Sequence, residues 1–371
     1  MTHSFFRMLL VAGATSALAH SAAFAQAGGE AAIETGASYS SLRGGLAFIG
    51  VSADDLLGSG LDFRLGYQAG EDGEALSATT SKTFSFGSTA LGEDTFARAT
   101  LNARTSDWSS QAYALETYRA SVEVGAETLS GFRYTGRLFW QQDSVDDFSD
   151  DVSPLAAIPL DASTAVGLGV GLGYSTFTAQ GPMATGFDVR GNFALATSAG
   201  DREWASSEIA AQYNAGLPMG LVLAMQAEAG KIEGRNGDSV SIVDRAFIGN
   251  PMPRGFAYTG LGPRDFVEGS VDTALGGNEF VTSSIELRVA TPNPDITVAG
   301  FADAGALWGL DEVTGGASGT IDDSYFLRTS VGLSLYWDSA FGLLQLNIAK
   351  PIDKRDTDQE ERVSLNLNFQ F

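Results

Sequence analysis

The sequence predicts an all-β protein, a sixteen-stranded antiparallel transmembrane β-barrel, and three observations lead to this prediction. Apolar and polar residues alternate with a period of two through most of the chain. Over the C-terminal half, the segments between alternating stretches are long and short in turn. An apolar segment near the N-terminus is typical of an export signal, and no comparable apolar run follows it.

Residues 1–25 have the features of a removable signal peptide. A weakly positive start ends at Arg7, an Ala-rich apolar run occupies 8–19, and Ala23-Phe24-Ala25 fits the small-x-small pattern before a cleaved bond. An amphipathic N-terminal helix is the alternative. Beyond residue 25 the chain has no apolar run of ~18 residues, the length that a membrane helix needs. We therefore expect cleavage after Ala25 and an exported product that is either soluble or a barrel, because only helices and closed barrels satisfy the backbone inside lipid.

The alternation is clearest near the C-terminus, where Val363, Leu365 and Leu367 are apolar and the residues between them are polar. The same pattern recurs in 344–348, 331–337 and 281–289. A period of two predicts strands with one apolar and one polar face. A soluble sandwich has the same pattern, so alternation alone does not distinguish the two folds.

The connections favour the membrane barrel. Backwards from Phe371 they run over 350–362, 338–342, 310–324, 291–295 and about 233–277, so that long and short alternate. Membrane barrels have short periplasmic turns and longer outer loops, whereas a sandwich has no reason for this asymmetry. The even number of strands is also typical of bacterial barrels. The predicted strands are 31–40, 43–52, 60–69, 75–87, 93–106, 112–125, 130–142, 163–176, 185–197, 203–215, 219–232, 278–290, 296–308, 325–337, 343–350 and 362–371. Aromatic residues near strand ends, such as Trp140, Trp308, Trp337 and Tyr325, favour interfacial girdles.

The composition excludes several classes of function. Lys and Arg total 22 against 45 Asp and Glu, a formal charge of −23, so nucleic acid is not an expected partner. The chain has no Cys, and its two histidines, His3 and His20, fall inside the predicted signal peptide. Histidine acid–base catalysis, thiol chemistry, disulfides and Cys/His zinc sites are therefore excluded from the mature chain. We expect no enzymatic activity, no catalytic residue, no metal and no cofactor.

One predicted loop is rich in aspartate. Carboxylates in this number could hold Ca²⁺, but their spacing is not that of an EF-hand. We expect a solvated extracellular acidic loop instead. The residues concerned are Asp143, Asp146, Asp147, Asp150 and Asp151.

Two motifs in the longest connection resemble the long-loop motif of the BamA/TamA outer-membrane insertase superfamily. Members carry a stretch like Asp-Arg-Phe-Phe-x-Gly and then Arg-Gly-Phe or Arg-Gly-Tyr. The corresponding residues here are Asp244-Arg245-Ala246-Phe247-Ile248-Gly249 and Arg254-Gly255-Phe256. In this comparison Asp244, Arg245 and Gly249 support the loop motif. The resemblance spans the mature chain and is dense after about residue 200. It implies a barrel domain over 26–371, whose strands leave no room for the periplasmic POTRA domains of the family's insertases.

The resemblance also implies a geometry, because in this family the long extracellular loop folds back into the lumen and its arginine meets acidic groups on the inner wall. The alternation independently turns Glu286 and Asp303 inward. Since an arginine can donate two charge-assisted hydrogen bonds to a carboxylate, we expect Arg254 to tie the loop to two adjacent strands. Gly255 would permit a backbone turn close to the wall, and Phe256 would pack beside it. The alternative is a solvated loop arginine above ordinary lumen acids.

The chain ends on the alternating aromatics Phe369 and Phe371. This ending resembles the C-terminal signal by which barrel proteins are inserted, so the protein is itself expected to be a client of the barrel assembly machinery. The alternative is merely a last strand, and one strand can serve both purposes. The expected location is the bacterial outer membrane, in contact with its lipids, including lipopolysaccharide.

The resemblance implies a role in the insertion and assembly, or the translocation, of outer-membrane proteins, which would then be its clients. A weak seam between the first strand (31–40) and the last would present unpaired edges that template an incoming strand by β-augmentation. The alternative is a passive pore or structural surface barrel that retains the fold without insertase activity.

Overall fold

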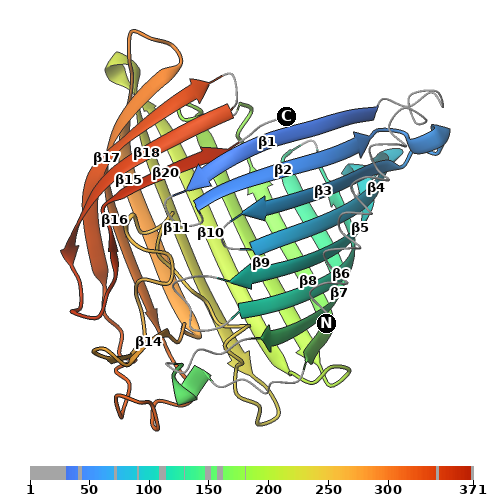
Figure 1. The fold of residues 1–371 in the computed structure, drawn as a ribbon. Helices are drawn as coiled ribbons and strands as arrows, with labels where there is room; N and C mark the ends of the chain where they lie inside the picture. The colour runs from blue at the N-terminus through green and yellow to red at the C-terminus, as the bar shows by residue number, and fades with distance from the viewer. Residues whose placement is uncertain are drawn as a thin grey trace.

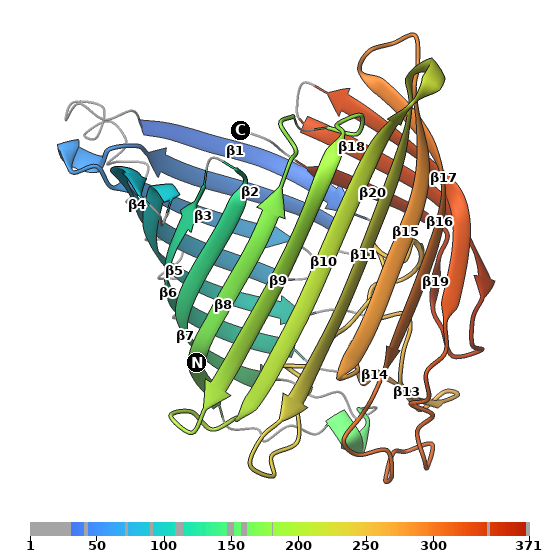
Figure 2. The same cartoon turned by 180° about the vertical axis from the view of Figure 1, so that it is seen from behind.

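The computed structural model describes residues 31–40, 44–70, 73–89, 92–107, 114–128, 130–146, 152–156, 162–179, 181–339 and 342–368. One antiparallel sheet of sixteen strands curves around an interior space (Figures 1 and 2). This confirms the predicted fold class. Residues 1–30, which include the predicted signal peptide, lie outside the described residues.

Sequential strands are neighbours throughout the sheet, as the predicted meander requires. The first and last strands lie close to each other, but no backbone ladder joins them among the described residues. The strands of the sheet are β1 (Ala31–Ser40), β2 (Gly44–Ala53), β3 (Asp62–Gly70), β4 (Gly73–Thr89), β5 (Gly92–Asp107), β6 (Ala114–Glu127), β7 (Phe132–Asp146), β8 (Ser163–Ser175), β9 (Gly186–Thr197), β10 (Trp204–Leu217), β11 (Leu221–Gly234), β15 (Glu279–Ala290), β16 (Ile296–Trp308), β17 (Arg328–Ser339), β18 (Gly342–Asp353) and β20 (Val363–Asn368).

Several strands extend beyond their predicted bounds because an antiparallel partner continues beside them. β7 reaches Asp146, which pairs with Ala114 of β6, so Trp140 lies in the strand interior and not near its end. The prediction ended the next-to-last strand before Pro351. In the structure β18 continues to Asp353. Ser330 of β17 pairs with Pro351 and Thr329 pairs with Asp353, so Ile352 is the extra residue of a bulge in β18. A bulge is where a strand tolerates proline, which has no N–H to donate.

The two faces of the sheet differ as the alternation predicts. Outward side chains are apolar and exposed on both sides of the barrel, with Leu333 on β17 at 67 % and Leu138 on β7 at 66 %. Such a continuous exposed apolar surface is expected of a barrel wall that faces lipid. No helix in the described part of the chain is long and apolar enough to span a bilayer.

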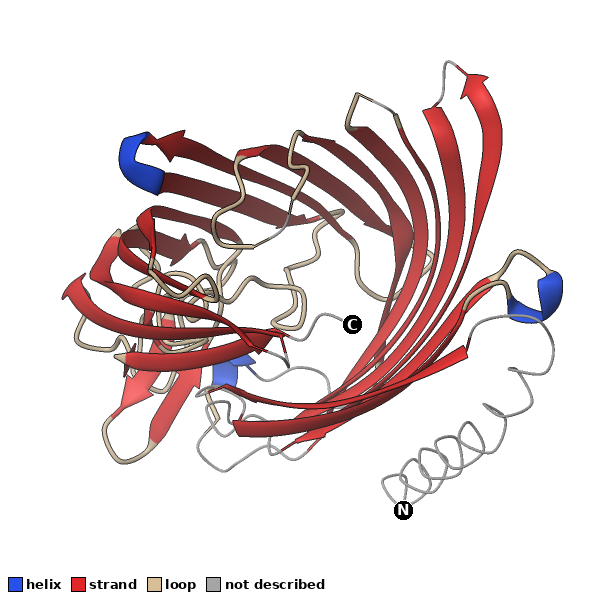
Figure 3. Cartoon of the chain, turned by 90° about the horizontal axis from the view of Figure 1, so that it is seen from above, coloured by secondary structure: helices blue, strands red, loops and turns tan. Residues whose placement is uncertain are grey.

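The longer connections carry further structure that the sequence did not predict. The 235–278 connection (hereafter the long loop) contains β12 (Gly255–Phe256) and a hairpin of β13 (Arg264–Val267) and β14 (Val271–Ala274). β12 pairs with β19 (Glu360–Glu361) in the β18–β20 connection. Figure 3 shows loop segments inside the wall of strands. Short 3-10 turns are η1 (Leu56–Gly58), η2 (Pro154–Ala156) and η3 (Pro218–Gly220).

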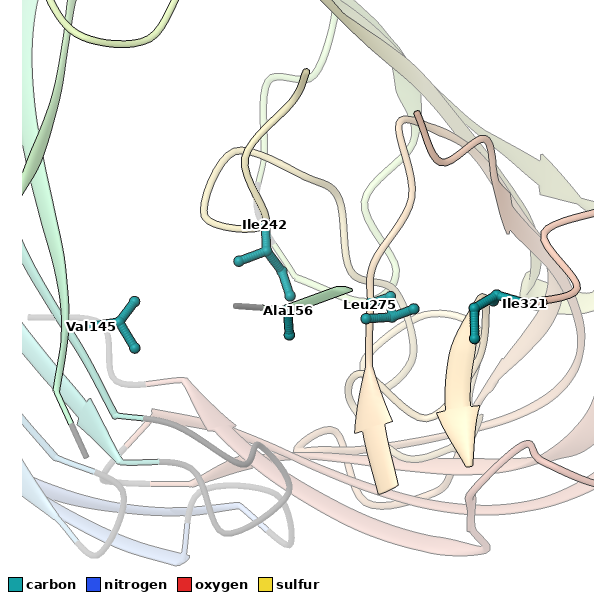
Figure 4. Close-up of a cluster of buried hydrophobic side chains, with 5 residues drawn as sticks. All are labelled: Val145, Ala156, Ile242, Leu275 and Ile321. Carbon is teal, nitrogen blue, oxygen red and sulfur yellow. The ribbon is translucent and has the colours of Figure 1, made fainter. Parts of the chain in front are cut away.

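Two buried apolar clusters hold these connections in place. One cluster joins β7, η2, the long loop and the β16–β17 connection, and Figure 4 shows its side chains, which come from separate segments. Its members are Val145, Ala156, Ile242, Leu275 and Ile321. The second cluster packs the long loop against β16 through Ile248, Phe256, Leu261 and Leu307. Burial of this apolar surface supplies a driving force for folding the loop inward.

Candidate functional site

Arg254 of the Arg-Gly-Phe motif lies against the inner wall and is 4 % exposed. Its Nε and Nη2 each donate a hydrogen bond of 2.8 Å to one carboxylate oxygen of Asp303, and its backbone N–H donates another of 2.9 Å. Nη1 donates to Glu286 at 3.2 Å. Because Glu286 lies on β15 and Asp303 on β16, one side chain fixes the loop to two neighbouring strands.

The pleat of the two strands places both carboxylates on the inward face. Glu286 and Asp303 are 4 % and 3 % exposed, whereas Ile285, the residue before Glu286, is 55 % exposed. The ladder sets Ser284 of β15 opposite Asp303. Ser284 Oγ donates to Asp303 at 2.6 Å and accepts a bond of 3.0 Å from Arg254 Nη2. Ser284 therefore bonds both to Asp303 and to the arginine that Asp303 binds.

The charges at this site balance. Arg288 Nε lies 3.3 Å from Glu286 Oε1, so two guanidinium groups face two carboxylates. Burial alone would lower the pKa of Arg254, but the hydrogen bond and charge of Asp303 outweigh it and raise that pKa. Arg254 is therefore held in its charged form. A buried charge set of this kind is tolerated only where every member is paired and hydrogen-bonded.

An aromatic ring completes the pocket around the guanidinium. The Phe301 ring of β16 lies under Arg254, with the guanidinium carbon 3.4 Å from the ring centroid, a cation–π contact. The ladder pairs Phe301 with Gly332 of β17. A Cβ on Gly332 would come within 2.4 Å of the ring, so this glycine provides the space that the ring occupies.

The rest of the motif is shaped to approach the wall. Gly255 has φ +93°, and a Cβ there would lie 3.2 Å from Ala349 Cβ and 3.4 Å from Pro351 Cδ on β18. This backbone conformation and close approach favour glycine. Phe256 is fully buried in the second apolar cluster. The motif also pairs with β19, through which the loop reaches the connection between the last two strands.

The three supporting residues lie outside the Arg254 cluster. Gly249 has φ +141°, and a Cβ there would clash with the Ala257 carbonyl oxygen at 1.9 Å. Arg245 donates to the carbonyl oxygens of Val240 at 3.2 Å and Leu275 at 3.1 Å. These contacts shape the loop itself. Asp244 lies elsewhere, beside Arg202.

The expectation that the aspartates of the acidic loop are all solvated is wrong for Asp143. It is 3 % exposed on the inward face of β7 and accepts a hydrogen bond of 2.6 Å from Arg202 Nη2. Arg202 Nε also lies 3.4 Å from Asp244 of the long loop. Burial raises the pKa of Asp244 to about 6, more than the nearby Arg202 charge lowers it. The difference arises because β7 runs beyond its predicted end and carries Asp143 inside.

Two buried polar contacts, each of which anchors one segment to another, were not predicted from the sequence. Arg328 at the start of β17 is fully buried and donates two bonds of 3.0 Å to Asp358 of the β18–β20 connection. Asp265 of β13 accepts bonds from Ser153 Oγ at 2.5 Å and from the backbone of 317–318 at 2.8 and 2.9 Å. Asp358 and the partners of Asp265 belong to connections that lack periodicity, so no sequence signal pointed to these two pairings.

A line of inward polar side chains continues from Arg254 to the last strand. Arg254 Nη1 donates to Ser334 Oγ at 2.9 Å, and Ser334 donates to Asn347 Oδ1 at 2.6 Å. Asn347 Nδ2 in turn donates to Ser364 Oγ of β20 at 3.1 Å. The loop arginine is thus linked through β17 and β18 to the strand nearest β1. Phe369 and Phe371, the predicted insertion signal, lie outside the described residues.

Comparisons with known proteins agree with this architecture. A family model described as the Omp85 superfamily domain matches residues 55–371. The outer membrane protein assembly factor BamA of Neorickettsia risticii is 34% identical over 190 residues, which cover 50% of this chain and 24% of that protein. The chain therefore matches about a quarter of the length of that relative.

Solved structures show the same fold. BamA from Haemophilus ducreyi lacking POTRA domains 1–3 superposes with a TM-score of 0.77 at 20% identity, covering 91% of this chain and 70% of that one. CdiB from Acinetobacter baumannii gives a TM-score of 0.55 at 12% identity, covering 91% and 60%. At these identities the likeness concerns the fold alone.

Proposed function

Because the chain belongs to the Omp85 superfamily, we propose that it is an outer-membrane barrel with a role in the insertion and assembly, or the translocation, of outer-membrane proteins. The similarity to an outer membrane protein assembly factor supports this role. Its clients are then other barrel or exported proteins, its surroundings are outer-membrane lipids including lipopolysaccharide, and its own export depends on the predicted signal peptide.

The observation that carries the proposal is the meeting of two sheet ends in an otherwise continuous wall. β1 and β20 lie close together, yet the ladders of the described strands end at each of them. The ladder between β20 and β18 is short among the described residues. It runs from the pair of Val363 and Ile348 to the pair of Asn368 and Leu343. A strand edge without a partner offers its N–H and C=O groups to another chain, so this seam suits β-augmentation by a client strand.

The docked loop complements the seam. The polar line from Arg254 to Ser364 holds β20 through its inward face while its outer edge faces β1. One side of the seam is thereby linked through β18 and β17 to the loop. An anchored edge keeps its register while a client strand adds to it, since register is otherwise weakly specified in a short strand.

Depletion of the protein from its native cells tests the role. We expect the folded amounts of several other outer-membrane barrels to fall, measured by heat-modifiable gel migration, and to recover when the wild-type gene is restored. The alternative is a passive pore or structural surface barrel. Unchanged barrel levels together with a large, steady conductance of the purified protein in planar bilayers would contradict the insertase role and favour the pore.

A further inference from the structure

A second connection contacts the inner wall, at the end of the barrel opposite the long loop. Because successive strands are antiparallel neighbours, the connections after β8 and β10 share one end of the barrel, and the long loop after β11 lies at the other. The β8–β9 connection begins after Ser175 and returns at Gly186. Thr176 and Phe187 close its base with a bond of 2.8 Å in each direction. Its residues 182–185 are hereafter called the strap.

Polar side chains of the inner wall hold the strap by its backbone. Asn214 of β10 is 2 % exposed, and its Nδ2 donates a hydrogen bond of 2.9 Å to the carbonyl oxygen of Ala184. Arg288 of β15 donates a bond of 2.8 Å from Nη1 to the carbonyl oxygen of Pro182. In the sheet, β10 and β11 separate β9 from β15. The connection between β8 and β9 therefore meets a side chain that originates three strands away.

The wall beside the strap is buried, although it faces the interior. The ladders set Ala224 of β11 opposite Asn214, and Val222 of β11 opposite Arg288. Ala224 and Val222 are 5 % and 4 % exposed. Gln226, the next residue on the same face, is exposed. The burial of this face is therefore confined to the end of β11 that lies nearest the strap.

Arg288 connects the strap to the site under the long loop. Its Nε donates to Glu286 Oε1 at 3.3 Å, and the hydroxyl of Tyr336 donates to the same oxygen at 2.6 Å. The other oxygen of Glu286 accepts the bond from Arg254. One buried carboxylate is thus shared between the arginine that holds the strap and the arginine that holds the loop. Bonds in such a network strengthen one another where water is excluded.

We propose that the strap and the long loop are coupled closures at the two ends of the lumen, and that Arg288 is the positioning residue that couples them. Arg254 of the docked loop holds Glu286 where Arg288 can meet both this carboxylate and the carbonyl of Pro182. Undocking of either segment frees a group that orders the other. Since coupling between two sites is reciprocal, each closure loosens when the other is released. The coupling does not require an insertase role.

Hydrogen exchange of the full chain in a neutral detergent tests the direction from strap to loop. Asn214→Leu removes a donor to the strap and leaves Glu286 and Arg288 unchanged. Exchange in the peptide that contains Arg254 should accelerate about threefold or more, because the docked loop opens more often. The matched control Asn192→Leu removes the same amide from an exposed position on β9. It should leave the exchange of that peptide as in wild type.

Cysteine labelling tests the direction from loop to strap. The chain has no native cysteine, so Met183→Cys provides a single reporter at a half-buried position of the strap. Its reaction with a charged methanethiosulfonate should become about threefold faster or more when Arg254→Ala is added, as reciprocal coupling requires. Addition of Arg119→Ala, which removes an arginine exposed to the lumen, should not change the rate. Heat-modifiable migration checks that each variant is folded.

A disulfide tests the coupling within one folded protein and replaces Asn214→Leu if that variant fails to fold. A Cβ on Gly216 of β10 would lie 3.8 Å from Thr185 Cγ2, a separation that brings Thr185→Cys and Gly216→Cys within reach of each other. Oxidation should slow exchange in the peptide that contains Arg254, and reduction should restore it. Exchange that ignores oxidation, equal acceleration in the two asparagine variants, or equal labelling in the two arginine backgrounds would each overturn the proposal.

Discussion

The inner wall of β15–β18 and the stretch of the β5–β7 inner wall that carries Arg119 and Arg137 are built on the same alternation but differ in exposure. Asp303 and Asn347 on the first are 3 % and 1 % exposed beneath the docked loop. Arg119 and Arg137 on the second remain exposed to the lumen. The outward faces of the two regions do not differ in this way, since both carry exposed apolar side chains such as Leu333 and Leu138.

This difference shows that a polar inner face becomes a core where a connection covers it, as the long loop does over β15–β18. Under the loop, polar groups lose water and must find partners within the protein, which makes each one costly to leave unpaired. On the open side, water satisfies the same kinds of group. Substitutions of similar chemistry should therefore have unequal consequences on the two walls.

The largest difference is expected for the arginines. Arg254→Ala leaves Glu286 and Asp303 buried without their common partner, and breaking such a pair costs roughly 3–5 kcal/mol. The heat-modifiable gel shift should occur at a distinctly lower temperature, and the loop should become sensitive to protease. Arg119→Ala, on the open wall, should change neither property much. Equal behaviour of the two variants would show that Arg254 does not anchor the loop.

An intermediate difference is expected for the asparagines. Asn347→Leu removes the link between Ser334 and Ser364 and leaves buried hydroxyl groups unpaired, which costs about 1–3 kcal/mol. Hydrogen exchange should accelerate at the amides of β20 more than at those of β16. The matched variant Asn102→Leu lies on β5, where the side chain is exposed. It should leave the exchange of β20 unchanged, and a uniform acceleration in both variants would contradict a specific link to the last strand.

Sequence reasoning identified the strands well because the alternation that defines them is local, and the same parity turned Glu286 and Asp303 inward. Their meeting with Arg254 across the lumen required the family resemblance, since no periodicity relates a loop residue to a wall. Arg328 stood in a predicted strand, but neither kind of signal linked it to Asp358. Asp265 was equally hidden, because its partners belong to connections whose conformation depends on tertiary packing.

Asp143 shows a different limit. Its neighbours in sequence are acidic, so composition placed it in a solvated loop, but the ladder with β6 carries it inside the barrel. Strand ends are set by the partner strand and not by the local pattern alone, and a shift of a few residues there converts a surface carboxylate into a buried one. Its contact with Arg202, and through Arg202 with Asp244, could not be predicted for this reason.

The smallest effect is expected where the long loop reaches towards the open wall. Asp244 is surrounded by Arg202, Asp143 and Arg119, and burial raises its pKa to about 6. Because the pKa of Asp244 is higher in the folded than in the unfolded state, its protonated form is the one that favours folding. This contribution to the free energy of unfolding is full below the unfolded pKa and is lost as the pH rises through 6. Two carboxylates share Arg202, so the charged form of Asp244 is incompletely compensated at neutral pH.

Asp244→Asn removes this titration while preserving the shape of the side chain. The free energy of unfolding of the variant minus that of wild type should increase by about 1 kcal/mol from pH 5 to pH 8. The gain should appear as a difference in the midpoint of the heat-modifiable gel shift at the two pH values. Glu268→Gln, which removes an exposed charge from the same loop, controls for net charge. Parallel pH profiles for wild type and Asp244→Asn would show that desolvation of this carboxylate does not weaken the loop on the open side. The two walls would then differ in packing without differing in pH response.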